Sequence, residues 1–215
     1  AGTITLMGYD NIAQEQQAKS EVGVVLDECY FHDTLRPTDI HTILSRVYEN
    51  WDKALFASCL KKFQLPEGKY VKEFSRGMKM KLSLAAALAH HPKLLILDEA
   101  TAGLDPVGVE SILGNIRDYH KAQNATIILV SHSMEEVARS VDRLVVVNDG
   151  KIPFQGAPRE VFAHGDELEA MGLGVPQMTR VFHRLRQMGV DIDPSVYTID
   201  QARQAILAKL KKEGK

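Results

Sequence analysis

Short apolar runs along the chain predict the strands of a buried sheet. Residues 94–97 (Leu-Leu-Ile-Leu) are continuously apolar, and residues 22–26 and 126–130 have a similar character. Such runs are typical of parallel strands that are covered on both faces. Alternating β-formers at residues 3–7, followed by a turn cluster, predict a short strand and hairpin. Asp149-Gly150 between two further strand-like stretches predicts another hairpin.

Apolar positions spaced three and four residues apart predict the helices. The first opens within residues 35–39, with Thr38 or Asp39 as its cap, and helical patterning continues with breaks to Phe63. A second helix begins at Ser75 and stops before Pro92. Five more helical segments are predicted at about 107–122, 134–140, 158–163, 177–188 and 199–212, with a loop-rich stretch at 165–176.

The alternation of helices with buried strands predicts an α/β fold with a mostly parallel sheet. We expect an ATPase-like main domain over residues 1–157, with a helical subdomain inserted at about 38–90, and a short helical C-terminal extension over 158–215. In parallel sheets, ligands bind at the carboxyl ends of the strands. Asp98, Glu99 and His132 fall at these ends.

The composition is that of an ordinary globular protein. Lys and Arg number 26 against 28 Asp and Glu, and this net charge of −2 gives no electrostatic footprint for nucleic acid. Cys29 and Cys59 form no metal-spaced pair and predict a reduced, cytosolic protein. No run approaches the roughly 20 apolar residues of a membrane span. We therefore expect any membrane role to come through a partner.

Two acids at the end of the most apolar strand are the strongest candidates for chemistry. A buried strand that delivers Asp98 at its tip is how P-loop enzymes hold the magnesium ion of a nucleotide. The neighbouring Glu99 is placed to act as a general base on water. A buried strand that simply ends in a solvated acidic turn fits the same residues, so the strand alone leaves both interpretations open.

Three further segments carry alternatives of the same kind. Ser75 and Gly77 begin a helix, where free N–H groups attract anions, but a plain Ser cap is by far the more usual explanation of this segment taken alone. Residues 101–106 form a turn that opens the next helix, which is ordinary turn chemistry by itself. His132 follows a buried strand, where a histidine is usually a hydrogen-bonded edge residue and less often a phosphate sensor.

Taken together and in this order, the segments resemble the ATP-binding cassette (ABC) family. Residues 74–78, 94–99, 103–105 and His132 match its signature motif, Walker B strand with catalytic glutamate, D-loop and switch histidine, and Ser75 and Asp98 have the family's spacing of 23 residues. The resemblance covers about residues 2–156 and implies a P-loop NTPase-like fold and an ATP-hydrolysing subunit of a transporter.

The resemblance implies a role for each matched residue. Asp98 would hold Mg²⁺ through its water shell, Glu99 would orient the attacking water, and His132 would contact the γ-phosphate of ATP. Family members hydrolyse ATP between two subunits arranged head to tail.

In such a homo- or heterodimer, Ser75 and Gly77 would touch the nucleotide of the opposite subunit, and Asp105 would cross the interface. A transmembrane subunit would be the other partner. It would meet residues 38–63 and the loop at Asp27 on the inner, cytoplasmic face of the membrane.

The sequence also departs from the family pattern. Arg76 and Met78 replace a Gly and a Gln of the usual signature, as in exporter-like members, and Asp27 stands where the family has a Gln that reaches the metal. Residues 168–188 instead resemble the tail of energy-coupling-factor ATPases. This mixture of features is also compatible with a chimeric chain.

The phosphate-binding loop is the largest departure. The sequence contains no G-x-x-x-x-G-K-[ST] motif. Because the family carries this loop upstream of the part that matches residues 2–10, we expect the sequence to begin just after it. A truncated or chimeric, non-catalytic cassette fragment that does not bind ATP by itself is therefore the alternative function.

Overall fold

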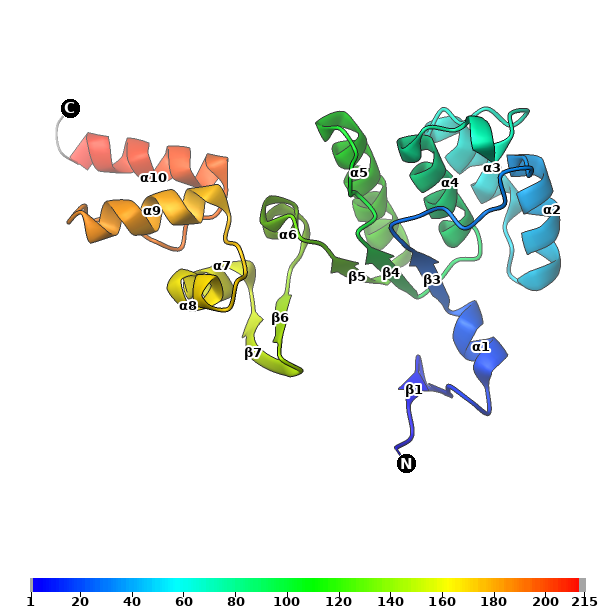
Figure 1. The fold of residues 1–215 in the computed structure, drawn as a ribbon, viewed down its shortest axis with the longest axis horizontal. Helices are drawn as coiled ribbons and strands as arrows, with labels where there is room; N and C mark the ends of the chain where they lie inside the picture. The colour runs from blue at the N-terminus through cyan, green and yellow to red at the C-terminus, as the bar shows by residue number, and fades with distance from the viewer. Residues whose placement is uncertain (1, 213–215) are drawn as a thin grey trace. The chain divides into compact units, whose positions relative to one another are not determined.

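The computed structural model describes residues 2–212, and the chain divides into two compact units, Ala1–Ser131 and His132–Lys215 (Figure 1). Each unit is considered by itself. This division after Ser131 lies upstream of the domain boundary that we predict after residue 157. The predicted boundary is that of the functional ATPase domain, and it stays a prediction.

The first unit is built on a three-stranded parallel sheet. Its strands lie in the order β3 (Val22–Val25), β4 (Leu94–Asp98) and β5 (Thr126–Val130), and Val24, Ile96 and Ile128 are aligned across it. These are the three apolar runs of the sequence, and the prediction of parallel strands is confirmed. The central strand β4 is the most buried, because both of its edges are paired.

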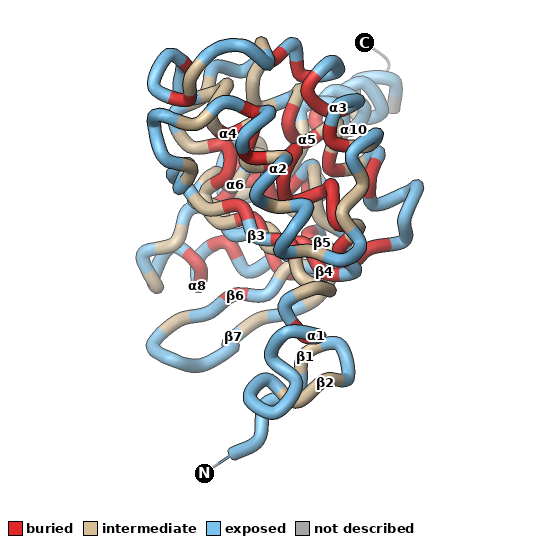
Figure 2. Tube along the Cα trace, turned by 90° about the vertical axis from the view of Figure 1, so that its right-hand side faces the viewer, coloured by how far each residue is buried: buried red, intermediate tan, exposed pale blue. Residues whose placement is uncertain are grey.

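Helices cover one face of the sheet of the first unit. On the other face Val24, Ile128 and Val130 are exposed, so the prediction of strands covered on both faces is wrong. In chain order the helices are α1 (Glu15–Ser20), α2 (Pro37–Val47), α3 (Lys53–Lys62), the 3₁₀ turn η1 (Val71–Glu73), α4 (Arg76–Leu88) and α5 (Pro106–Gln123). One hydrophobic cluster joins α3, α4 and α5 to the strands, and Figure 2 shows the buried stretches along these elements. The tightest approach is that of α4 to β3, where Gly23 leaves no room for a side chain.

Two sequence predictions in this unit need correction. The cap of α2 is Arg36 rather than Thr38 or Asp39, because Pro37 already has the φ of a first helical residue and Asp39 accepts the Arg36 backbone N–H at 2.8 Å. The strand predicted at residues 3–7 is shorter. It forms a hairpin of β1 (Thr5–Leu6) and β2 (Tyr9–Asp10) whose turn residues, Met7 and Gly8, both have positive φ.

The second unit combines a hairpin with helices. It contains α6 (Met134–Ser140), β6 (Leu144–Asn148), β7 (Lys151–Gly156), α7 (Pro158–Phe162), α8 (Gly165–Ala170), α9 (Gln177–Gln187) and α10 (Ile199–Lys212). Asp149 and Gly150 form the predicted hairpin turn with positive φ values. The helix α8 lies in the stretch predicted to be loop-rich. Its turn is stabilised by Leu168, which is buried in the cluster that contains Phe162.

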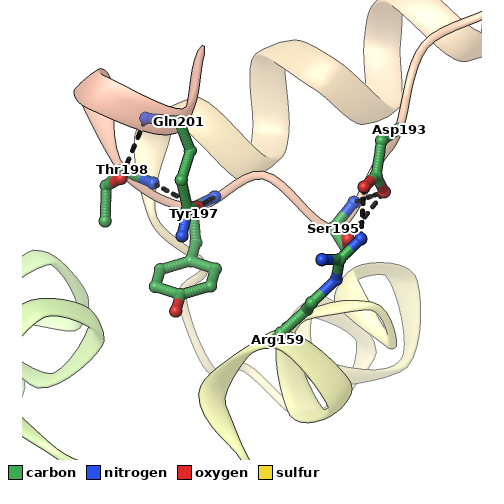
Figure 3. A network of polar contacts seen from close by, with 6 residues as sticks. All are labelled: Arg159, Asp193, Ser195, Tyr197, Thr198 and Gln201. Carbon is green, nitrogen blue, oxygen red and sulfur yellow. Dashed lines mark hydrogen bonds and ion pairs between the residues drawn. The ribbon is translucent and has the colours of Figure 1, made fainter. Parts of the chain in front are cut away.

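Polar contacts fix the segment between α9 and α10 (Figure 3). Asp193 accepts hydrogen bonds from the Ser195 backbone and hydroxyl and pairs with Arg159 of α7. Thr198 and Gln201 then form a reciprocal cap on α10. The Gln201 N–H donates to Thr198 Oγ1 at 3.2 Å, and the Thr198 N–H donates to Gln201 Oε1 at 3.3 Å. Among the residues described, no helix is long and apolar enough to span a bilayer.

Candidate functional site

The end of β4 carries the two candidate acids. Asp98 is aligned with Val130 of β5, and the backbone N–H of Glu99 continues the ladder by donating to the Val130 carbonyl oxygen at 3.0 Å. Both acids are half-buried. Glu99 has a φ of 49°, a left-handed conformation that costs free energy in a non-glycine residue and is often found at functional sites. The chain therefore turns sharply at the acid predicted to act as the base.

The prediction for His132 stays a prediction. It follows Val130 by two residues, is exposed, and belongs to the second unit, whereas Asp98 and Glu99 belong to the first. The strand register aligns Val130 with Asp98. The imidazole and the two carboxylates belong to different units, so neither unit by itself contains all three side chains.

Asp27 follows β3 at the same edge of the sheet. Val25, the last residue of β3, is aligned with Leu97, so Asp98 lies at the carboxyl end of β4 and Asp27 lies two residues beyond the carboxyl end of the neighbouring β3. The Asp27 side chain is exposed. This common edge is where the sequence predicts the ligand.

Ser75 forms the predicted cap of α4. Its Oγ accepts the Met78 N–H at 3.3 Å, and the exposed Ser75 and half-buried Gly77 leave the first turn of this 13-residue helix at the surface. The plain capping role is therefore present in the structure. A role in binding phosphate is compatible with it, because a serine hydroxyl has more than one hydrogen-bonding site.

The turn before α5 packs against this same helix start. Asp105 caps α5 by accepting the Gly108 N–H at 2.7 Å. Gly103, with a φ of 71°, lies under Arg76, whose Nη1 is 2.8 Å from the position that a Cβ of residue 103 would take. A Cβ at Gly77 would in turn lie 3.3 Å from Leu104 Cδ2. The segments at residues 75–77 and 103–105, which are distant in sequence, thus form one surface.

Arg76 is the residue of this surface that sequence reasoning misses. The sequence marks it only as a departure from the family glycine, and gives no indication that its guanidinium covers Gly103. The signal that the sequence does offer is the glycine at position 103. Its positive φ in the turn is one reason for a glycine there, and the Arg76 side chain that covers it is the other.

The carboxylates of this site suit a metal ion that is also coordinated by a bound substrate. They suit less well a metal ion that is coordinated by protein side chains alone. Residues 2–212 contain no group of three or more His, Cys, Asp or Glu side chains arranged to hold a metal ion. Mg²⁺ usually keeps several waters and binds through one or two carboxylates together with substrate phosphates. Asp98, with Glu99 beside it, matches that donor set.

Comparisons with known proteins agree with this geometry. The ABC transporter family profile matches residues 1–102. The chain is 31% identical to the energy-coupling factor transporter ATP-binding protein EcfA2 of Acetivibrio thermocellus over 99% of this chain and 78% of that protein. It is 48% identical to EcfA2 of Caldanaerobacter subterraneus subsp. tengcongensis over 65% of this chain and 49% of that protein. The chain spans about half the length of the relatives to which it is more than 45% identical.

Solved structures give the same fold. One described as an ATP-binding subunit of an ABC transporter aligns with a TM-score of 0.67 at 22% identity, covering 86% of this chain and 77% of that one. The structure of cbiO1 from Clostridium perfringens aligns with a TM-score of 0.64 at 24% identity, covering 86% of this chain and 76% of the other. At these identities the likeness concerns the fold alone.

The fold is of the P-loop NTPase-like α/β class, as the sequence predicts. The chain belongs to the ATP-binding proteins of the ABC transporter family, and the two relatives described above are energy-coupling factor ATP-binding proteins.

Proposed function

We propose that the chain is an ATP-binding and ATP-hydrolysing subunit of an ABC transporter, located at the cytoplasmic face of a membrane through a transmembrane partner. The observation that carries this proposal is the end of β4 in a member of this family. There, Asp98 and Glu99 lie beside the end of β5, and the Glu99 N–H is hydrogen-bonded to the Val130 carbonyl oxygen.

Asp98, Glu99 and His132 divide the work at one nucleotide. Asp98 holds the magnesium ion of the nucleotide through water, and Glu99 accepts a proton from the attacking water as general base. The backbone at Glu99, with a φ of 49°, supports this role because sparsely populated backbone conformations of non-glycine residues cluster at functional sites. His132 contacts the γ-phosphate. Mg²⁺, when bound, neutralises charge on the phosphate oxygens.

Ser75, Gly77 and Asp105 act across the interface of an ATPase dimer. The start of α4 offers its free N–H groups to the γ-phosphate of the opposite subunit, and Asp105 reaches the opposite site. The contact of Arg76 with Gly103 joins residues 75–77 and 103–105 into a single surface. This supports the proposal, because a second subunit that binds this surface contacts both segments.

The transmembrane partner contacts the first unit at α2 and at the loop that follows β3. This surface exposes large apolar side chains, among them Tyr30, Ile43 and Val47, and exposed apolar groups of this kind are typical of protein interfaces. Asp27, in the same loop, links this surface to the nucleotide. The similar protein cbiO1 is described as part of the transporter complex cbiONQ.

Steady-state hydrolysis tests the proposal. A G-x-x-x-x-G-K-[ST] segment of a family member is joined to the amino end of the full chain, so that the phosphate-binding loop and Glu99 lie in the same subunit, and phosphate release is compared for the wild-type sequence, Glu99→Gln and the control Glu67→Gln. Glu67 is exposed and lies in the turn after α3. We expect Glu99→Gln to lower the rate of phosphate release by at least about 100-fold, as removal of a general base does, and Glu67→Gln to leave it unchanged.

The same experiment distinguishes the alternative. Equal rates for wild type and Glu99→Gln would refute the role of Glu99. No phosphate release by the joined protein, together with no binding of Mg·ATP, would favour the non-catalytic cassette fragment over the ATPase subunit.

A further inference from the structure

A pocket of about 130 Å³ lies between α8 and α9 in the second unit. Six of the residues that line it are Gly165, Asp166, Glu169, Arg180, His183 and Arg184. None of them belongs to the signature, Walker B or D-loop segments, so the ATPase function proposed above gives the pocket no role.

The two helices build the pocket by running in opposite directions. Near one end, Arg180 Nε donates to Glu169 Oε1 at 3.0 Å. At the other end, the His183 ring rests on Gly165, where an added Cβ would lie 3.1 Å from the ring Cε1. A side chain at residue 165 would fill the space that the ring now occupies. The pocket depends on this glycine.

The charges that line the pocket are not all paired. Arg180 and Glu169 neutralise each other. Within the described chain, Asp166 has no ion pair or hydrogen bond through its side chain, and Arg184 donates only to Gln187 Oε1, at 3.2 Å. One carboxylate and one guanidinium therefore remain available to a ligand.

His183 adds an unsatisfied group beside them. Its Nε2 is buried and lacks a hydrogen-bond partner among residues 2–212. A buried polar atom left in this state costs free energy. The ring lines the pocket, but its Nε2 lies against Gly165 and is closed off from the open space, so the ring shapes the wall and offers no hydrogen bond to a bound group through this atom.

We propose that this pocket binds a small zwitterion of the amino-acid class, which carries a carboxylate and an ammonium group a few bonds apart. The carboxylate contacts Arg184, and the ammonium contacts Asp166. Complementarity of charge favours this class, because a simple anion would meet Asp166 and a simple cation would meet Arg184. The volume of about 130 Å³ equals that of about four water molecules, which suits a ligand of few atoms.

Calorimetric titration of the full chain tests the class of ligand. The probes are glycine, β-alanine and 4-aminobutyrate, which differ in the spacing of their charges, with acetate and methylammonium as half-ligands. We expect at least one zwitterion to bind with a millimolar dissociation constant and at least about tenfold more tightly than either half-ligand, since the half-ligands lack one ionic contact. Equal binding of acetate, or no binding of any zwitterion up to about 50 mM, would overturn the proposal.

Variants of the lining residues test the location. Asp166→Asn and Arg184→Gln should each weaken binding of the best probe at least about tenfold, and Gly165→Ala should weaken it without a change in charge, because the His183 ring must move. Arg203→Gln on α10 is the control for the loss of a cationic side chain away from the pocket. Circular dichroism reports whether each variant is folded. Unchanged binding by folded Asp166→Asn and Arg184→Gln would place the ligand elsewhere. ATP hydrolysis is not involved, so this test and that of the ATPase proposal fail separately.

Discussion

Replacing Gly23 by alanine tests the closest contact between the sheet and its covering helices. Gly23 is buried in β3, and an added Cβ would lie 3.0 Å from each of three atoms: the carbonyl oxygen of Ala87, Cδ1 of Leu95 and Cγ of Pro92. These distances are shorter than ordinary van der Waals contact by a few tenths of an ångström or more. The first atom is backbone of α4, so the whole helix end has to move.

The expected loss of stability follows from two opposing effects. Overpacking of a well-packed core costs about 1–3 kcal/mol. Replacing glycine by alanine also reduces the conformational freedom of the unfolded chain, which contributes about 0.4–1 kcal/mol in the opposite direction. We therefore expect Gly23→Ala to lower the free energy of unfolding of the first unit by about 1–2 kcal/mol.

Urea denaturation followed by the fluorescence of Trp51 measures this loss. Trp51 is the single tryptophan of the chain and packs against the core of the first unit. The matched control is Gly114→Ala within α5, where an added Cβ would meet only Arg117 Nη2, at 3.9 Å. In this helical position alanine should stabilise the unit by about 0.5–1 kcal/mol. If Gly23→Ala were as stable as wild type or more stable, the close approach of α4 to β3 would be wrong.

Variants at three further positions test the helix caps and a buried histidine. Ser75→Ala should lower the free energy of unfolding by about 0.5–1 kcal/mol, and Ser75→Asp should restore it. The loss is at the low end for a cap because the hydrogen bond from the Met78 N–H to Ser75 Oγ is 3.3 Å long. An unchanged urea midpoint for Ser75→Ala would contradict the cap. Burial lowers the pKa of His90, so the folded state favours the neutral ring, and stability from this source is lost as the pH falls below the unfolded value of about 6.5. Wild type should therefore lose more stability than His90→Gln between about pH 7.5 and pH 5.5 in parallel urea titrations, and equal losses would refute this. Thr198→Ala should speed amide hydrogen exchange in the first turn of α10, since Thr198 Oγ1 then no longer accepts the Gln201 N–H; unchanged exchange would show that the cap is dispensable.

Local sequence signals were sufficient for the central strands and several caps. The apolar run that ends at Asp98 forms a paired, buried strand wherever it is placed in a sheet, so its boundaries follow from the run itself. Ser75 caps α4 because the signal, a serine before a periodic apolar helix, lies within four residues. The same holds for the hairpin turn at Asp149-Gly150.

Features that depend on tertiary contacts were not accessible in this way. The six residues of α8 are too few to show helical periodicity, and the helix is held by the burial of Leu168 in the cluster of the second unit. The contact of Arg76 with Gly103 joins residues far apart in sequence. The candidate acids Asp98 and Glu99 were found from sequence, but the left-handed backbone at Glu99 was not, since glutamate does not favour it.

Paramagnetic broadening by Mn²⁺·ATP tests the proposed nucleotide site most directly. The ¹⁵N-labelled chain carries the joined G-x-x-x-x-G-K-[ST] segment described above, and Mn²⁺·ATP replaces the magnesium complex. Our account predicts selective loss of the amide signals of residues 98–100, 130–132 and 75–78, because the metal–nucleotide complex lies against the first two segments and the opposite nucleotide against the third. Broadening confined to other parts of the chain, or none, would contradict it.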